Sequence, residues 1–302
     1  MTHARLSPRG LAACATAFTL WGLFPAYLHP LSGVPPLEIV AHRIVWSCLF
    51  LLGVLLLRAE LGGLTTTLGQ PRLLAGLASS AFLITCNWLV YVWSVTHGHI
   101  VESSLGYYIN PLVNVLLGVL VLRERPSGAQ WSAIALAALA VLYLAVQAGG
   151  PPWIAFALAL SFSLYGFVRK IISVDALPGL ATETLLLLPL AFGYLAWREM
   201  SGVATFGHTG LALAGLLIGS GIVTAVPLFL FAYGARRLPY STVGVLQYIG
   251  PTLQLACGVI FYHESFEPAR AAGFALLWAA LILYAAEGVW RARLLARRAA
   301  RA

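Results

Sequence analysis

The chain has 302 residues, of which 60% are hydrophobic and 9% are charged, and its formal net charge is +8. Soluble domains carry about 25% charged residues, so this composition excludes a soluble protein, including a soluble nucleic-acid-binding protein. A membrane helix needs about 20 apolar residues, so ten helices would use about 200 residues and leave no room for a soluble domain. The sequence therefore predicts an all-α membrane protein whose surroundings are the lipid bilayer.

Breaks in hydrophobicity divide the chain into ten predicted transmembrane helices joined by short connections rich in Gly and Pro. The first five are residues 10–28, 38–57, 73–95, 101–122 and 128–147, and the second five are residues 152–172, 181–197, 210–235, 239–262 and 268–289. These sets define a five-helix domain over residues 1–147, a second over residues 152–290, and a basic tail over residues 291–302.

Positively charged residues lie almost entirely on one side of this predicted topology. With the N-terminus inside, fifteen of the eighteen Arg and Lys residues fall in inside loops or at the ends. Arg198 and Arg270 fall outside, and Arg43 falls within the second span. Because cytoplasmic loops carry an excess of Lys and Arg, we expect both termini to be cytoplasmic.

A segment of the first half recurs in the second half. Residues 97–124, HGHIVESSLGYYINPLVNVLLGVLVLRE, align without a gap with residues 237–264, RLPYSTVGVLQYIGPTLQLACGVIFYHE. The identical pairs are Tyr108 and Tyr248, Ile109 and Ile249, Pro111 and Pro251, Gly118 and Gly258, Val119 and Val259, and Glu124 and Glu264. Five spans are an odd number, so the two halves enter the membrane in opposite senses. Inverted repeats are typical of secondary transporters, whose binding site lies near the bilayer midplane.

Each copy of the repeat contains a proline within an apolar segment. Pro111 and Pro251 each remove a backbone hydrogen bond, which frees the carbonyls of Tyr107 and Gln247. A freed carbonyl in the membrane has to be satisfied by protein or by a water-filled cavity. We expect both prolines to kink their helices beside a cavity.

Arg43 in the second span is the first candidate for substrate binding. A charged side chain in mid-span costs about 2.5–3.5 kcal/mol on insertion scales and therefore has to face a cavity or a partner. Its planar fork suits a carboxylate, which favours an anionic or zwitterionic substrate. The alternative is a structural role, in which Arg43 reaches the outer surface or pairs with Glu38. Glu38, His42 and Glu102 are candidates for proton transfer or gating.

The third span carries a second group of candidate binding residues. Asn87 and Tyr91 share a helix face, with Trp88 and Trp93 on its flanks. A polar amide with aromatic rings in an apolar helix suits a pocket for a flat or amphipathic molecule. Aromatic residues near the end of a span can instead anchor the helix at the membrane interface, and Trp93 also fits that role.

The fourth and ninth spans contribute matching polar stripes around their prolines. Tyr107, Asn110 and Asn114 are spaced i, i+3 and i+7, and Gln247 and Gln254 stand at the positions equivalent to Tyr107 and Asn114. We expect the two stripes to form facing walls of one substrate cavity. The alternative is hydrogen bonding between helices, for which Asn and Gln are also used.

The remaining reactive side chains indicate no catalytic, metal or cofactor site. His97 and His99 lack further ligands at a metal-binding spacing, and the four cysteines are interpreted as packing residues. Glu183 is interpreted as a helix-start carboxylate or a proton carrier, and Glu124 and Glu264 as loop charges. There is no phosphate-binding Gly-rich loop, so we expect an ion gradient, with proton exchange as one choice, or the substrate's own gradient to drive transport.

Several stretches together resemble a known family. They are WGLFPAY at 21–27, EIVAHRIVWS at 38–47, NWLVYVWSV at 87–95, GHIVESSLGYYINPL at 98–112, VDALPGLATET at 174–184 and LQYIGPTLQ at 246–254. They resemble the RarD branch of the EamA-type transporters, in the drug/metabolite transporter superfamily, over nearly the whole chain. The resemblance implies a ten-helix permease of the bacterial inner membrane for small metabolites or drugs, with a nominal link to chloramphenicol.

Other functions stay open at the level of the sequence. A channel or a receptor-like scaffold would use the same spans, and flux that does not saturate would support a channel. An intramembrane enzyme built from Glu38, His42 and Ser47 is disfavoured, because these side chains do not converge on one helix face. The alanine-rich fifth and tenth spans suit close helix packing, either as a scaffold or in a homodimer.

Overall fold

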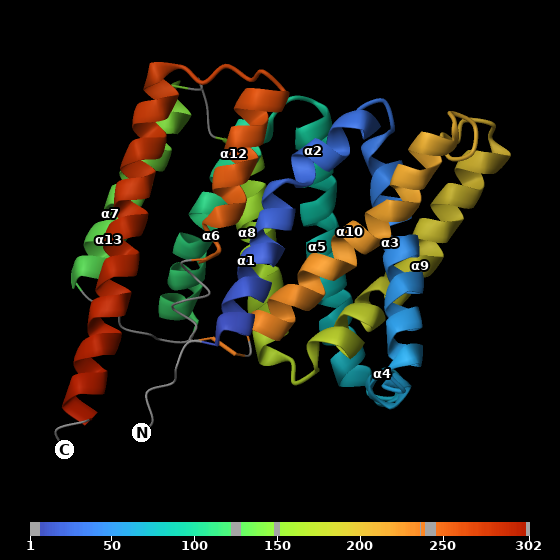
Figure 1. The fold of residues 1–302 in the computed structure, drawn as a ribbon, viewed down its shortest axis with the longest axis horizontal. Coiled ribbons are helices and arrows are strands. Elements are labelled where there is room, and N and C mark those ends of the chain that lie inside the picture. The colour runs from blue at the N-terminus through green and yellow to red at the C-terminus, as the bar shows by residue number, and fades with distance from the viewer. Residues whose placement is uncertain (1–6, 122–127, 148–151, 236, 239–245, 300–302) are drawn as a thin grey trace.

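The computed structural model of the chain describes residues 7–121, 128–147, 152–235, 237–238 and 246–299. All regular secondary structure in these residues is helical, which confirms the predicted all-α class (Figure 1). The helices are α1 (Pro8–Gly22), α2 (Phe24–Leu28), η1 (His29–Leu31), α3 (Pro36–Leu57), α4 (Leu61–Leu68), α5 (Pro71–Thr96), α6 (Ile100–Leu120), α7 (Gly128–Gln147), α8 (Trp153–Ile171), α9 (Ala176–Met200), α10 (Leu211–Ala235), α12 (Ile249–Phe261) and α13 (Pro268–Ala299).

Several described helices are long and apolar enough to cross a membrane. Four of them pass by length and composition: α3, α5, α9 and residues Leu211–Phe231 of α10. A fifth span forms if α1 and the segment Phe24–Leu31 are taken together, with a bend of 43° between them. The chain is therefore a multi-pass membrane protein.

Proline sets the start of several helices. Pro8, Pro36 and Pro71 stand in the first turns of α1, α3 and α5, where a backbone N–H has no intrahelical acceptor and the fixed φ of proline suits the helix. At α1 the side chain of Ser7 also accepts a hydrogen bond from the N–H of Gly10 at 3.2 Å. Such an N-cap satisfies one of the free donors at a helix start.

The first predicted span is broken rather than continuous. Pro25 has no N–H to donate to the carbonyl of Trp21, and the helix divides into α1 and α2 at Leu23. The freed carbonyl of Trp21 accepts a hydrogen bond from Gln254 Nε2 of α12 at 3.3 Å. Tyr262 Oη donates to the carbonyl of Pro25 at 2.9 Å. The break is thus satisfied by polar side chains from a neighbouring helix, as a broken membrane helix requires.

The two repeat prolines stand in different positions of their helices. The helix α6 continues from Ile100 to Leu120 through Pro111. In the second copy Leu246 is helical, Gln247 lies in a turn and α12 begins at Ile249, so Pro251 stands in the first turn of a helix. Pro251 therefore follows a helix break and does not kink a helix interior, because the first turn tolerates the missing N–H.

The helices pack in a single bundle with α7 and α13 side by side at one edge (Figure 1). The other edge is built by α3, α9 and α10, and α3 packs on both of its neighbours there. The start of α1, the end of α13 and the short helix α4 all lie toward the lower face in this view (Figure 1). The candidate binding residues lie on α3, α5, α6 and α12 and in the turn before α12.

Candidate functional site

Arg43 is buried among aromatic side chains in the interior of the bundle. Only 5% of its surface is exposed. Its Nε donates a hydrogen bond to Thr224 Oγ1 of α10 at 3.0 Å, and its guanidinium carbon lies 4.7 Å from the ring centroids of both Phe24 and Trp88. Its Nη1 has no hydrogen-bond acceptor among the described residues. A buried cation therefore keeps donor capacity that a ligand can use.

Tyr91 completes the aromatic wall beside Arg43. Its ring stacks on Phe24 with 6.0 Å between centroids and meets the ring of Tyr107 edge-on at 5.8 Å. Tyr91 is 4% exposed, and its Oη has no hydrogen-bond partner within the part of the chain that the structure describes. The structure thus brings the predicted residues Arg43, Trp88, Tyr91 and Tyr107 into one cluster.

Asn87 acts behind this cluster, as a link between helices. Its Nδ2 donates to the carbonyl of Leu158 at 3.1 Å and to Ser161 Oγ at 3.0 Å, both on α8. Its Oδ1 accepts a hydrogen bond from Tyr107 Oη at 3.2 Å. Asn87 therefore orients Tyr107 and joins α5, α6 and α8, with its amide already occupied by protein partners.

Two residues of the predicted polar stripes make hydrogen bonds to other helices. Asn110 is fully buried, and its Oδ1 accepts a short hydrogen bond from the hydroxyl of Ser163 on α8. Gln254 donates to the carbonyl of Trp21 on α1. Gln247 is half-buried in the turn before α12, and the side chain of Asn114 lies outside the described residues. The contacts of Asn110 and Gln254 fit hydrogen bonding between helices, the alternative to facing cavity walls.

Glu38 is a fully buried structural carboxylate. It accepts hydrogen bonds from Arg198 Nη2 at 2.8 Å, from the N–H groups of Thr205 and Phe206 at 2.8 and 3.3 Å, and from Thr205 Oγ1 at 3.0 Å. Its ion-pair partner is thus Arg198, which corrects the alternative of a pair with Arg43. With four donors, Glu38 fastens the start of α3 to the connection between α9 and α10.

His42 and Glu102, the other two candidates for gating, also contact neighbouring protein groups. His42 Nδ1 accepts a hydrogen bond from Trp46 Nε1 at 3.2 Å, and its ring lies 4.8 Å from that of Phe206. Glu102 accepts a hydrogen bond from the N–H of Ile154 at 3.1 Å, at the start of α8. A carboxylate is favoured at a helix N-terminus by the free N–H groups and the helix dipole. Glu102 therefore caps a neighbouring helix.

Glu264 has a similar capping role, which corrects its interpretation as a loop charge. Its two carboxylate oxygens accept hydrogen bonds from the N–H groups of Ile100 and Val101 at 2.5 and 2.8 Å, at the start of α6. The sequence places these residues more than 160 positions apart, so their contact could not be inferred from local spacing.

Within the described ranges, no three His, Cys, Asp or Glu side chains lie close enough together to bind a metal ion.

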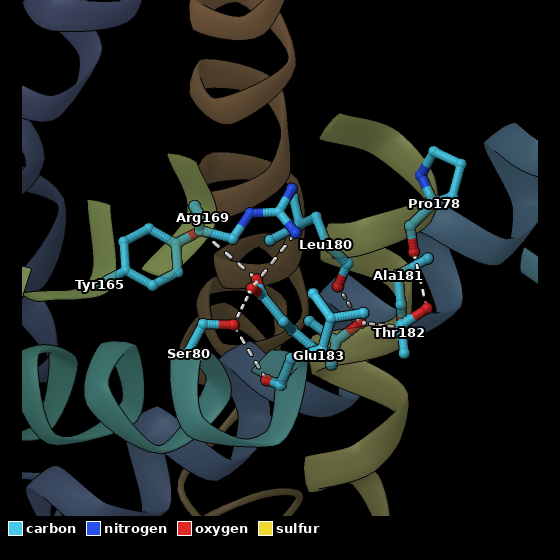
Figure 2. A network of polar contacts seen from close by, with 10 residues as sticks. Ser80, Tyr165, Arg169, Pro178, Leu180, Ala181, Thr182 and Glu183 are labelled. Carbon is cyan, nitrogen blue, oxygen red and sulfur yellow. Dashed lines mark hydrogen bonds and ion pairs between the residues drawn. The ribbon is translucent and has the colours of Figure 1, made fainter. Parts of the chain in front are cut away.

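A buried ion pair that the sequence did not predict lies between α8 and α9 (Figure 2). Glu183 is 1% exposed, accepts a hydrogen bond from Ser80 Oγ at 2.5 Å, and lies 3.6 Å from Arg169 Nη1. The expected span began at residue 181, whereas α9 begins at Ala176. Glu183 therefore lies two turns inside the helix and is not a helix-start carboxylate.

Comparisons with known proteins give one consistent family. The model of the EamA-like transporter family matches residues 9–146. Protein RarD of Streptomyces exfoliatus is 44% identical over 92% of this chain and 88% of its own length. An uncharacterized transporter of Pseudomonas aeruginosa is 43% identical over 94% of this chain and 95% of its own length. A solved structure described as "Crystal structure of protein" has a TM-score of 0.63, covers 91% of this chain and 96% of its own, and is 19% identical, a likeness of fold alone.

The apolar helices define a multi-pass membrane protein, and the family model and the relatives place it in the transporter class. The chain belongs to the RarD branch of the EamA-like transporters, in the drug/metabolite transporter superfamily. This membership confirms the resemblance found in the sequence motifs. It also argues against an enzyme, because the family is one of transporters of small molecules.

Proposed function

We propose that this protein is a secondary transporter that exposes a central site alternately to the two sides of the bacterial inner membrane. Its substrate is a small flat anion or zwitterion, held by Arg43 and the surrounding aromatic rings. The two halves, residues 1–147 and 152–290, form inverted five-helix repeats, and both termini and the basic tail are cytoplasmic. The lower face in Figure 1, which carries α4 and the outer ends of α1 and α13, is then the cytoplasmic face.

The packing of the helices supports the inverted repeat. If α3 corresponds to α9, α6 to α12 and α7 to α13, then each of these helices packs against its own counterpart. The other contacts are matched as well, since α1 packs on α10 and α12 just as α8 packs on α5 and α6. Elements that lie on a two-fold axis meet their own counterparts. Tyr108 and Tyr248 stand at equivalent positions of the two repeats, 140 positions apart, and their rings stack on each other with 6.4 Å between centroids. An axis in the membrane plane between two repeats is the arrangement on which rocking transporters are built.

The buried, incompletely satisfied guanidinium of Arg43 is the observation that carries the substrate class. Burying a charge without its full set of partners is costly, so the site gains stability when an anion binds. Arginine offers two parallel N–H donors to a carboxylate, and Tyr91 Oη adds a third donor nearby. The guanidinium lies over the rings of Phe24 and Trp88, so the apolar surroundings of the charge would suit the aromatic or amphipathic part of a ligand. The cluster thus suits a compound with a carboxylate at one end and a flat apolar part.

Counterflow in proteoliposomes tests this function directly. Compounds that raise the melting temperature of the purified protein would be loaded inside vesicles, and uptake of the labelled compound would be followed. Saturable counterflow that Arg43→Gln abolishes and Arg43→Lys only weakens is expected, because lysine keeps the charge but loses the fork. Arg58→Gln, at an exposed arginine at the end of the same helix, is the matched control. Flux that rises without saturation, or that is unchanged in Arg43→Gln, would contradict the proposal.

A further inference from the structure

The side chains around Glu183 form a second buried charged site, separate from the Arg43 cluster. Figure 2 shows its carboxylate between Ser80 of α5 and the residues Tyr165 and Arg169 of α8. Tyr165 Oη donates to Glu183 Oε2 at 3.4 Å, a longer contact than the 2.5 Å hydrogen bond from Ser80. An ionisable residue inside a membrane helix is costly and marks ion or proton pathways in pumps and transporters.

The ion pair at this site is loose in comparison with that of Glu38. Arg169 Nη1 approaches Glu183 Oε1 at 3.6 Å and makes no hydrogen bond within the described residues. Glu38, in contrast, holds Arg198 at 2.8 Å and accepts two backbone N–H donors as well. Glu38 thus has four donors that include a cation at hydrogen-bond distance, whereas Glu183 has only hydroxyl donors and a more distant cation. Glu183 can therefore gain or lose a proton with little rearrangement of its surroundings.

The start of α9 leaves room for the side chain of Arg169 from α8. A Cβ placed on Gly179 would overlap the guanidinium of Arg169, so the glycine leaves the space that the cation occupies. The side chain of Arg169 keeps 16% of its surface exposed, while that of Glu183 keeps 2%. A hollow of about 610 Å³ lies next to this region and is lined by Asp175, the residue before α9, and by Pro178 and Leu180 of α9 among others. Arg169 thus connects a buried carboxylate to the face of the bundle that carries α4.

We propose that Glu183 is the proton-binding residue of the transport cycle and that Arg169 is its counter-charge. This inference rests on the proposed transport function. A hydronium ion on the α4 side gives its proton to a carboxylate oxygen of Glu183 and leaves as water, and the net charge of the pair changes from zero to +1. The electrostatic attraction between Glu183 of α9 and Arg169 of α8 is then lost, which removes the charge interaction between these two helices. The proton leaves to the opposite side after the halves have rocked, and the ion pair forms again.

The groups that face Glu183 from each neighbouring helix are few. Ser80 faces it from α5, and Tyr165 and Arg169 face it from α8. From α3, Cys48 lies beside Thr184, the residue after Glu183. Neither α4 nor α10, which also pack on α9, contains a charged residue. Among the described side chains, Arg169 is the charged group that pairs with Glu183.

An infrared titration tests the proton site without any substrate. The purified protein in detergent would be titrated with acid, and the carbonyl band of a protonated carboxylic acid would be compared between variants. We expect a component of this band that is present in the parent and in Glu38→Gln and absent from Glu183→Gln. In Glu183→Asp the component should persist at a shifted frequency, which covers the case that the glutamine variant folds poorly. Identical titrations of the parent and Glu183→Gln would overturn the proposal.

A transport measurement then separates this proposal from the function on which it rests. For each variant, accumulation driven by a pH gradient would be divided by substrate exchange in counterflow. This ratio should fall at least about tenfold in Glu183→Gln and stay unchanged in Glu38→Gln. An unchanged ratio in Glu183→Gln would overturn the coupling role of Glu183. Absence of counterflow in the parent, with a normal infrared titration, would instead contradict the proposed transport function.

Discussion

Arg43 and Glu183 occupy the same position in two helices that pack against each other. Arg43 is the eighth residue of α3, which begins at Pro36, and Glu183 is the eighth residue of α9, which begins at Ala176. Both are at most 5% exposed. In an inverted repeat these helices run in opposite directions, so the two charges would lie at equal depths from opposite membrane faces. The substrate site and the proton site of this account are thus counterparts, of opposite charge, in the two halves.

Gly179→Ala should destabilise the protein slightly by displacing Arg169. The new Cβ would overlap the guanidinium, which lies at the end of a flexible side chain and has to move, so the cost should be about 1 kcal/mol, the lower end for overpacking. Unfolding in a detergent titration would measure the loss. In an Arg169→Ala background the same substitution should become neutral or slightly stabilising, because alanine is the better helix former. An equal loss in both backgrounds would contradict the contact between Gly179 and Arg169.

Glu38→Gln should lower the stability strongly without affecting ligand binding. The substitution leaves Arg198 as a buried cation without its carboxylate, which costs on the order of 3–5 kcal/mol when a buried pair is broken. The free energy of unfolding would be measured beside the rise in melting temperature that a ligand causes. Arg198→Gln serves as the control from the other side of the pair. A Glu38→Gln protein of normal stability would contradict the structural role of Glu38.

Gln254→Leu should destabilise the broken span, and the loss should depend on Pro25. Removing the amide leaves the carbonyl of Trp21 without its donor, which costs about 1–3 kcal/mol for a buried polar group. In a Pro25→Ala background, the new backbone N–H at position 25 can bond the same carbonyl. The loss caused by Gln254→Leu should therefore shrink in that background. A double-mutant cycle of unfolding free energies with no coupling would refute this account of the break.

The capping carboxylate Glu264 predicts a pH dependence of stability. Burial raises the pKa of Glu264 above its ordinary value of 4.5, against the opposing effect of the hydrogen bonds from Val101 and Ile100. The folded protein thus binds this proton more tightly than the unfolded chain does. Protonation of Glu264 therefore stabilises the folded state fully below pH 4.5, and this stabilisation is lost as the pH rises through the folded-state pKa. The melting temperature of the parent minus that of Glu264→Gln should fall over this window. A difference that rises with pH would contradict the sign.

The sequence predicted well what depends on hydrophobicity and on single unusual residues. Apolar runs predicted an all-helical membrane protein, and the cost of a charge in mid-span singled out Arg43. Helical spacing placed Tyr91 and Asn87 on one face, and both are buried there. These signals depend on residues that are close together in the sequence, so a single sequence is enough to detect them.

Contacts between distant segments could not be predicted in the same way. The partner of Glu38 is 160 positions away, and the caps provided by Glu102 and Glu264 join different helices. Repeat spacing placed Gln254 and Asn110 in two stripes expected to line one cavity, whereas each side chain makes a hydrogen bond to another helix. Glu183 was interpreted as a possible helix-start carboxylate because the predicted helix began at residue 181, five residues after the observed start at Ala176. The offset of 140 that relates the repeats would have aligned it with Arg43.

Ligand-dependent thermal stability of the purified protein tests the central claim that Arg43 binds an anionic group. The parent and Arg43→Gln would be compared against aromatic and aliphatic carboxylates, zwitterionic amino acids, hydrophobic cations and chloramphenicol. A ligand at about 100 times its dissociation constant stabilises the folded state by about 2.7 kcal/mol. We predict that a carboxylate or zwitterion raises the melting temperature of the parent and leaves that of Arg43→Gln unchanged. Equal stabilisation of both proteins, or stabilisation by hydrophobic cations alone, would contradict the claim.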